Sequence, residues 1–455
     1  MSCTDPRQPQ AHDAAANAPQ SGRQRVVLHV GTPKSGTTYL QELLWASRPA
    51  LAEAGVLYPG EHPGAHFHAV LDAQQRSFHG HVDPGVAGAW DRIVAAARDH
   101  QGTTVVSHEL FGDLSGAEAA RALADLDFAE VHVVVTVRDL ARQLPAVWQE
   151  DVKNRHALPF ADFLDMVRPG SDRPDEQRPA ADTTEGHAEA FWLRHDVPAV
   201  LRRWAAGLPA EQVHVVTVPP QGADPALLWE RFAAVVGVDP AVATQPDGRR
   251  NQSLGRAESE LLRRLNERLD YGVEWPLYAA RITHHLAVGA LAGRPGSARL
   301  TLPAGERAWV SAAADAVVAE LAALDCTVTG DLEDLRVPAR GRDDDRPADL
   351  AELLDAALDA IAALIPVGPP PAPQPAPEPA PAGGPVAVAQ PVAVPEPAAV
   401  AEPAVPVLPQ PRLPGAHVVA RAGRDRGARL WRRVVGARAL PPRPAADAPV
   451  ETAGV

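Results

Sequence analysis

The sequence contains very little cysteine. Cys3 and Cys326 are the two cysteines of a 455-residue chain, and Cys3 lies in a polar N-terminal segment. A disulfide framework or a cysteine metal site requires several cysteines at suitable spacings. The two residues therefore indicate neither kind of site, and they are typical of a protein from the reducing cytoplasm.

Long apolar runs and a positive net charge are also absent. A membrane-spanning helix needs about 18 to 20 consecutive apolar residues, and the sequence has no such window. Residues 1–22 lack the basic start and apolar stretch of a secretory signal. The formal net charge of −14 gives no general basic surface for binding nucleic acid. We therefore expect a cytoplasmic protein that neither spans a membrane nor has nucleic acid as a partner.

The remaining composition predicts a globular domain with extensions at both ends. Hydrophobic residues make up 45% of the chain, which is enough for a sizeable core. Residues 1–24 are expected to be a disordered leader, because they offer little apolar surface to bury. We assign a folded domain to residues 25–338, an amphipathic helix to 339–365, a Pro/Ala-rich disordered linker to 366–415 and an arginine-rich tail to 416–455.

The last three segments differ in what they can contribute. The amphipathic helix is expected between Pro347 and Pro366, and it either docks on the core or pairs with a partner. The linker holds 18 of the 47 prolines and is expected to be extended. The tail either solubilises the chain or contacts a protein or a membrane surface. Apolar residues form one stripe on the expected helix: Leu350, Leu353, Leu354, Ala357, Leu358, Ile361, Leu364 and Ile365.

β-Branched runs alternate with helical patterns along the folded domain. Short, nearly continuous apolar runs begin at Val26, Thr103, Val131 and Val213, and segments with helical apolar spacing lie between them. Buried strands separated by helices are typical of a parallel sheet that is covered on both faces. The pattern predicts an α/β fold with three α/β/α layers around a central parallel sheet.

The stretch "VVLHVGTPKSGTTYLQ" after Arg25 carries the strongest functional signal. A glycine-rich turn between a strand and a helix directs backbone N–H groups and the positive end of the helix at an anion. Gly31 and Gly36 have the separation of a Walker loop, but Thr37 stands where the Walker lysine belongs, and the lysine is Lys34 inside the loop. This earlier lysine indicates a phosphate-binding loop for a shorter donor than a nucleoside triphosphate.

The segment "TPKSGTTYLQ" resembles the 5′-phosphosulfate loop of the sulfotransferase family, which reads PKSGTT followed by an aromatic residue and a leucine. The resemblance implies a P-loop NTPase-like sulfotransferase fold and 3′-phosphoadenosine 5′-phosphosulfate as the sulfuryl donor, without a metal. It also implies that donor-binding residues lie in the loop: Pro33, Lys34, Ser35, Gly36, Thr37 and Thr38.

A second segment, "VHVVVTVRD", ends in Arg138 at the head of a predicted helix. In the sulfotransferase family an arginine at this strand end binds the 3′-phosphate of the donor, so the resemblance assigns that role to Arg138. The family has a serine eight residues later, where this chain has Ala146. Arg142, Gln143 and Gln149 are candidates to replace that serine as the second 3′-phosphate ligand.

A third segment, "RRNQSLGRAE", resembles the Asn-x-Ser-Leu segment with which many bacterial and carbohydrate sulfotransferases close over the nucleotide. The resemblance adds Asn251 and Ser253 to the donor site, whereas a capped helix start at Ser253 would explain the segment equally well. The Arg-Lys-Gly signature of cytosolic sulfotransferases is absent, so the chain is not a close relative of that branch.

Sulfuryl transfer requires a base on the acceptor side and a cation on the leaving-group side. Lys34 suits the leaving-group side, because its ammonium can neutralise the charge that builds on the bridging oxygen of the nucleotide. The strand "TTVVSHELF" ends in His108 and Glu109, and in the family this strand end carries a catalytic histidine or glutamate. The pKa of an ordinary histidine lies closer to neutrality, which favours His108 as the base over Glu109.

The acceptor is expected to be a small molecule, a lipid or a carbohydrate with a hydroxyl or amine. A histidine-rich segment from His62 to His81 is interpreted as a loop over the acceptor pocket in preference to a metal site. Two other functions stay open. A P-loop kinase would need a magnesium-binding acid, for which Asp139 is the only candidate, and a non-catalytic nucleotide-binding scaffold would explain Ala146.

Overall fold

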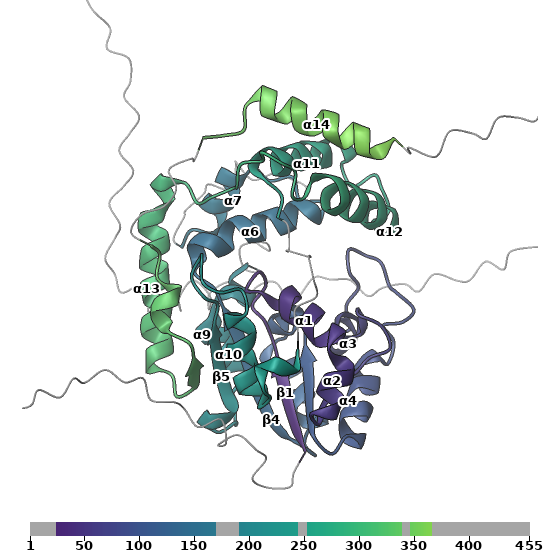
Figure 1. Ribbon diagram of the computed structural model, residues 1–455, viewed down its shortest axis with the longest axis vertical. Helices are drawn as coiled ribbons and strands as arrows, with labels where there is room; N and C mark the ends of the chain where they lie inside the picture. Colours follow the sequence, from purple (N-terminus) through teal and green to yellow (C-terminus); the bar gives the residue numbers. More distant parts are fainter. Residues whose placement is uncertain (1–23, 170–190, 244–252, 339–345, 366–455) are drawn as a thin grey trace, which may run out of the picture.

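The computed structural model describes residues 24–169, 191–243, 253–338 and 346–365 (Figure 1). The predictions for the leader up to residue 23, the linker and the tail lie outside these residues, as does Asn251. Within the described ranges, no helix combines the length and the apolar character needed to cross a bilayer.

A six-stranded sheet forms the centre of the fold. Its strand order is β2-β3-β1-β4-β5-β6, and every neighbouring pair is parallel. The prediction of an α/β fold with a central parallel sheet is therefore confirmed. Two edge strands were not predicted, because two or three residues are too few to show a pattern. The strands are β1 (Arg25–His29), β2 (Val56–Leu57), β3 (Thr103–Ser107), β4 (Glu130–Val137), β5 (Val213–Thr217) and β6 (Thr327–Thr329).

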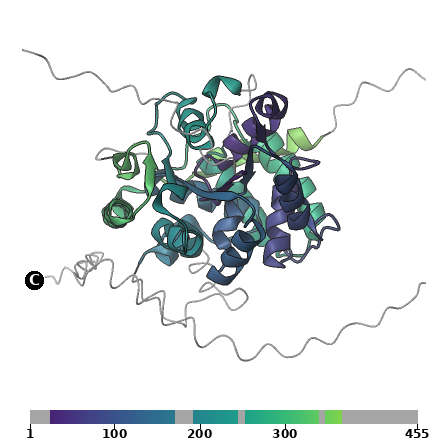
Figure 2. The same cartoon turned by 90° about the horizontal axis from the view of Figure 1, so that it is seen from below.

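Helices cover both faces of the sheet (Figure 2). Successive residues of a strand point to opposite faces, so Val27 packs into one apolar core and Val26 and Leu28 into the other. This arrangement is compatible with three α/β/α layers. The first face carries α1 (Thr37–Ala46), α2 (Arg48–Glu53) and α10 (Leu227–Val236). The second carries α3 (Ala65–Gln74), α4 (Ala89–Asp99), α5 (Gly116–Asp125), α9 (Val197–Trp204) and the C-terminal half of α13 (Arg307–Ala323).

A separate helical layer lies beyond the carboxyl ends of the central strands (Figure 1). Its own apolar core joins α6, α7, α11, the π-helical segment η6 and the N-terminal half of α13. The elements are α6 (Leu140–Lys153), α7 (Phe160–Val167), α11 (Arg256–Leu269), α12 (Trp275–Tyr278) and η6 (Ala279–Leu291). Short helical turns complete the described chain: η2 (Glu109–Asp113), η4 (Ala210–Gln212), η5 (Pro240–Val242), η7 (Ala304–Glu306) and η8 (Leu332–Leu335).

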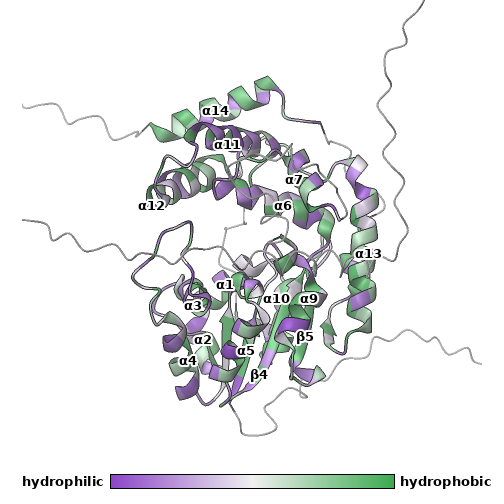
Figure 3. Cartoon of the chain, turned by 180° about the vertical axis from the view of Figure 1, so that it is seen from behind, coloured by the Kyte–Doolittle hydropathy of each residue, from purple (hydrophilic) through white to green (hydrophobic). Residues whose placement is uncertain are grey.

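The predicted amphipathic helix is α14 (Leu350–Leu364), and it docks on α11 and η6. Its buried residues are Leu353, Ala356 and Ala360, and Glu352 pairs with Arg256 at 3.1 Å. Leu353 and two alanines therefore form the packed face, and most of the predicted stripe faces solvent. The ribbon of α14 is largely green in Figure 3, the colour of apolar residues. The exposed members are Leu350, Leu354, Leu358, Ile361, Leu364 and Ile365.

Candidate active site

Three segments that the sequence analysis singled out meet at one edge of the sheet. Strand β1 lies between β3 and β4, with His29 beside Ser107 on one side and beside Val134 on the other. The glycine-rich loop follows β1, His108 and Glu109 follow β3, and Arg138 follows β4. Ligands of open α/β sheets bind at the carboxyl ends of strands, where the strand order reverses. The fold thus places all three segments next to one another at the carboxyl ends of β1, β3 and β4.

The loop turns sharply into α1. Lys34 and Gly36 have φ angles of 62° and 87°, in the left-handed region that favours glycine. A Cβ at Gly36 would lie 2.4 Å from a terminal methyl group of Leu228, so a larger residue would also require that side chain to move. Gly36 caps α1 without a side-chain hydrogen bond. A helix start directs the N–H groups of its first turn and the positive end of the helix at an anion.

The predicted loop ligands do not all face the same way. Ser35 is fully buried and its hydroxyl lies 2.5 Å from both the carbonyl oxygen of Thr32 and the hydroxyl of Thr136. Thr37 is buried, whereas Thr38 is exposed and Pro33 is half-buried. The Ser35 hydroxyl is therefore part of the support beneath the loop, and the Ser35 N–H donates to the Thr32 carbonyl oxygen at 3.3 Å.

Lys34 contacts an acid that the sequence analysis did not identify. Its Nζ lies 2.6 Å from Oε2 of Glu150 on α6, and Lys153 contacts the same oxygen at 2.5 Å. Burial would raise the pKa of Glu150, but Lys34 and Lys153 outweigh it and bring that pKa to about 2. Glu150 is therefore ionised at neutral pH. An anionic ligand at Lys34 must compete with this carboxylate.

Arginine side chains gather beside the loop. Arg138 donates to the carbonyl oxygen of Lys34 at 3.2 Å, and its buried Nε has no hydrogen-bond partner among the described residues. Burial, Arg142 and Arg299 lower the pKa of Arg138, and Asp139 raises it; together they bring that pKa to about 10. Nη2 of Arg142 is likewise buried without a partner in this part of the chain. The cluster offers unused N–H donors and excess positive charge to an anion.

The three candidates for a second 3′-phosphate ligand differ in their hydrogen-bond partners. Gln143 donates to Thr32 and to the carbonyl oxygen of Pro33, so it supports the loop from below. Gln149 donates to Leu254 and Ser259 and holds α6 against α11. Of the three candidates, Arg142 alone keeps an unused donor at the cluster.

Arg299 is an additional cation that sequence reasoning missed. It is exposed, forms an isolated β-bridge with Gly255, and lies close enough to Arg138 to affect its pKa. No local motif marks it, because it approaches Arg138 only through the fold. Ser253 is exposed, and α11 begins at Arg256 with Gly255 as its N-cap, so the alternative of a helix capped by Ser253 is wrong.

His108 and Glu109 lie together at the end of β3. Nδ1 of His108 accepts a hydrogen bond from the Leu110 N–H at 3.2 Å, and burial lowers the pKa of His108 against the opposing charges of Glu109 and Asp113. Neutral His108 therefore carries its hydrogen on Nε2 and has no free nitrogen lone pair for a second proton.

Glu109 is the better proton acceptor of the two. Burial would raise its pKa, but His108, a backbone hydrogen bond, Gln41 and Lys34 together hold the pKa of Glu109 below its usual value. Gln41 donates to Oε2 at 3.0 Å, which leaves acceptor capacity on the carboxylate. The arrangement places an ionised carboxylate beside the glycine-rich loop.

The histidine-rich segment lies between the end of β3, where His108 and Glu109 stand, and α12. The Phe67 ring is 5.4 Å from the His108 ring, and His79 stacks on Trp275 of α12 at 3.9 Å. His66 is buried and bonded to the carbonyl oxygen of Pro59 at 2.8 Å. In the described ranges, no set of three or more His, Cys, Asp or Glu side chains is arranged to hold a metal ion. The position agrees with a loop beside the acceptor, which stays a prediction.

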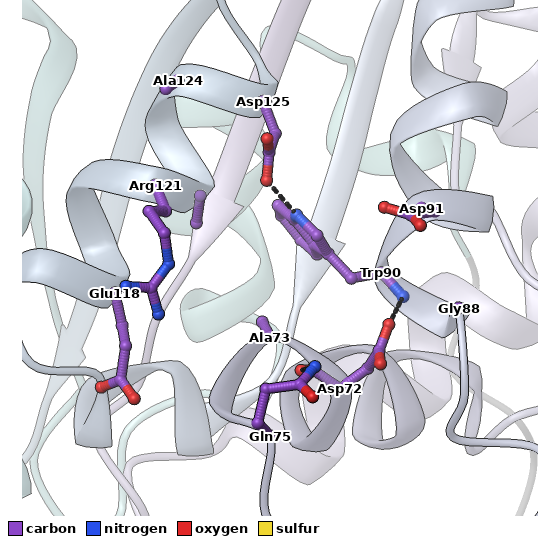
Figure 4. Close-up of a pocket in the computed structure, with 11 residues that line it drawn as sticks. Asp72, Ala73, Gln75, Gly88, Trp90, Asp91, Glu118, Arg121, Ala124 and Asp125 are labelled. Atoms are coloured by element: carbon purple, nitrogen blue, oxygen red, sulfur yellow. Dashed lines mark hydrogen bonds between the residues drawn. The ribbon is translucent and has the colours of Figure 1, made fainter.

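A pocket of about 350 Å³ lies elsewhere, between α3, α4 and α5 (Figure 4). Trp90 donates its indole N–H to Asp125 at 2.8 Å and its backbone N–H to Asp72 at 3.0 Å. Asp91 and Glu118 add two more carboxylates to the lining, and Arg121 is its only cation. This negative lining disfavours a phosphorylated donor, so the pocket is not the candidate site.

Comparisons with known proteins add no relative. No family model, no curated protein and no solved structure matches the chain.

Proposed function

We propose that the protein is a sulfotransferase that uses 3′-phosphoadenosine 5′-phosphosulfate as its donor, with the P-loop NTPase-like fold of that family. One observation carries the proposal. A phosphate loop with Lys34, an ionised Glu109 and the Arg138 cluster adjoin one another at the carboxyl ends of three neighbouring strands. These are a cation for a leaving group, a base for an acceptor and a site for a second phosphate.

The donor site fits two separated phosphate groups. The loop amides and Lys34 would hold the 5′-phosphosulfate. Arg138, Arg142 and Arg299 would hold the 3′-phosphate, and the unused Nε of Arg138 and Nη2 of Arg142 support this assignment. The 5′-phosphosulfate is anionic and would replace the Glu150 carboxylate as the partner of Lys34.

The reaction would be an in-line displacement. An acceptor hydroxyl oxygen forms a bond to sulfur while the bond from sulfur to the bridging oxygen of the nucleotide breaks. Glu109 takes the hydroxyl proton, and the Lys34 ammonium stabilises the negative charge on the departing bisphosphate. The products are a sulfate ester and 3′-phosphoadenosine 5′-phosphate, so no oxidant or metal is needed for balance. The acceptor would be a small molecule, a lipid or a carbohydrate in the cytoplasm.

A kinase is less well supported by the geometry. Its candidate magnesium ligand, Asp139, is 3% exposed, accepts the Arg142 backbone N–H as the N-cap of α6, and forms an ion pair with the Arg142 side chain. These partners occupy the carboxylate. The Arg138 cluster also has no role with a nucleotide that lacks a 3′-phosphate.

Calorimetric titration with 3′-phosphoadenosine 5′-phosphate tests the proposed function. We expect micromolar or tighter binding, and at least tenfold weaker binding of ATP with magnesium. Stronger binding of ATP would replace the proposal with the kinase. Absence of binding by both ligands would favour the non-catalytic scaffold.

The identity of the base gives a separate prediction. Glu109→Gln should lower kcat at least about a hundredfold, because it removes the proton acceptor. His108→Asn should cost less than about tenfold, since asparagine can accept the Leu110 N–H in place of Nδ1. The lowered pKa of Glu109 keeps it ionised at and above neutral pH, so kcat should stay level there and fall only at acidic pH, below the usual pKa of a glutamate. An inactive His108→Asn beside an active Glu109→Gln would reverse the assignment.

A further inference from the structure

A buried chain of hydrogen bonds lies beneath the donor loop. His29 is the last residue of β1 and is fully buried, with its ring 5.1 Å from that of Phe232. Its Nδ1 lies 2.8 Å from the hydroxyl of Ser107 on β3, and its Nε2 lies 3.0 Å from the hydroxyl of Thr136 on β4. One imidazole thus links the three central strands directly below the loop.

Thr136 extends this chain into the loop itself. Its hydroxyl donates to the carbonyl oxygen of Gly31 at 3.1 Å and lies 2.5 Å from the Ser35 hydroxyl. Its backbone N–H donates to the same Gly31 carbonyl at 2.7 Å, and its own carbonyl accepts the Thr32 N–H at 2.9 Å. Thr136 therefore contacts three residues of the loop: Gly31, Thr32 and Ser35.

The hydrogen-bond donors and acceptors of this chain can be paired with the His29 ring uncharged. If the hydroxyl of Thr136 donates to Gly31, its oxygen can accept from Nε2–H of His29, while Nδ1 of His29 accepts from Ser107. Burial lowers the pKa of His29 to about 4, against the opposing effect of Glu109, so the ring is uncharged at neutral pH. The chain of bonds is buried throughout, which makes an unpaired member costly.

We propose that Thr136, oriented by His29, is a positioning residue that keeps residues 31–36 in the shape that binds the donor. The role rests on the proposed function. Lys34 holds a left-handed φ of 62°, which a lysine adopts at an energetic cost and keeps only when its surroundings hold it. A loop already held in its binding shape loses less entropy when the anion binds.

Three variants test the positioning role. Thr136→Val removes the hydroxyl and keeps the shape, Thr136→Ser restores the hydroxyl, and Thr104→Val makes the same change at an equally buried threonine of β3. We expect Thr136→Val to weaken binding of 3′-phosphoadenosine 5′-phosphate at least tenfold in calorimetry. Thr136→Ser should stay within threefold of the wild type, and Thr104→Val should be unchanged.

Hydrogen exchange gives a second readout that does not depend on the ligand. Amides of residues 31–36 should exchange at least tenfold faster in Thr136→Val, with no such change in Thr136→Ser or Thr104→Val. Unchanged loop exchange, or equally faster exchange throughout the sheet, would overturn the positioning role. Failure of the wild type to bind the bisphosphate would defeat the proposed function alone, and the exchange result would still decide whether Thr136 positions the loop.

Discussion

Replacing Lys34 with alanine is expected to lower kcat about a hundred- to a thousandfold, the size of effect seen when one group that stabilises developing charge is removed. Lys34 is the only cation of the loop, and in the proposed reaction its ammonium neutralises the departing bisphosphate. The fold should be retained, because the Lys34 side chain is only half-buried and its ion-pair partner Glu150 is also partly exposed. Single-turnover rates with saturating donor, together with circular dichroism, measure both quantities.

Lys153→Ala is the matched control for this experiment. Lys153 contacts the same Glu150 oxygen as Lys34, but it lies on α6 and outside the loop. We expect less than a tenfold loss of kcat in Lys153→Ala. Near-normal turnover by a folded Lys34→Ala, or equal losses in the two variants, would contradict a specific role for Lys34 at the leaving oxygen.

Arg138→Ala is expected to weaken binding of 3′-phosphoadenosine 5′-phosphate about ten- to a hundredfold. Each hydrogen bond to a charged group contributes roughly 1.5 to 3 kcal/mol, and Arg138 has an unused buried donor to offer. Binding of adenosine 5′-monophosphate, which lacks the 3′-phosphate, should change less than threefold. The comparison of the two ligands isolates the 3′-phosphate from the rest of the nucleotide.

Arg202→Ala controls for the loss of one positive charge. Arg202 is an exposed residue of α9 that pairs with Glu320, away from the loop. Its replacement should leave the affinities of both nucleotides unchanged. An equal loss of affinity for both nucleotides in Arg138→Ala would show that Arg138 shapes the loop through its bond to the Lys34 carbonyl and does not read the 3′-phosphate.

The four long strands were predictable from the sequence because each is a nearly continuous apolar run. A strand buried on both faces leaves this local signal. Strands β3 and β5 begin at the first residue of their runs, and β1 and β4 begin one residue earlier. Strands β2 and β6 were not predictable, since their two or three residues are specified by pairing with β3 and β5. The exposed stripe of α14 was also unexpected, because helical periodicity identifies an apolar face but not the surface it meets.

The sequence alone determined where the glycine-rich loop lies and that it can bind a phosphate group. Its glycines, its early lysine and the strand before it are neighbours in the chain, and local backbone geometry follows from such neighbours. The resemblance to the sulfotransferase family, applied to the residues that end two apolar strands, identified Arg138, His108 and Glu109 as candidates.

Only the tertiary structure decided which groups complete the site. Glu150 meets Lys34 across 116 residues, and Thr136 meets Ser35 across 101. Strand pairing and the docking of α6 create these contacts, and no local pattern encodes them. The tautomer of His108 was decided in the same way, by the turn that presents the Leu110 N–H to its ring. Candidate residues that are neighbours in the sequence could thus be predicted from it. Contacts between residues of separate elements became known only from the fold.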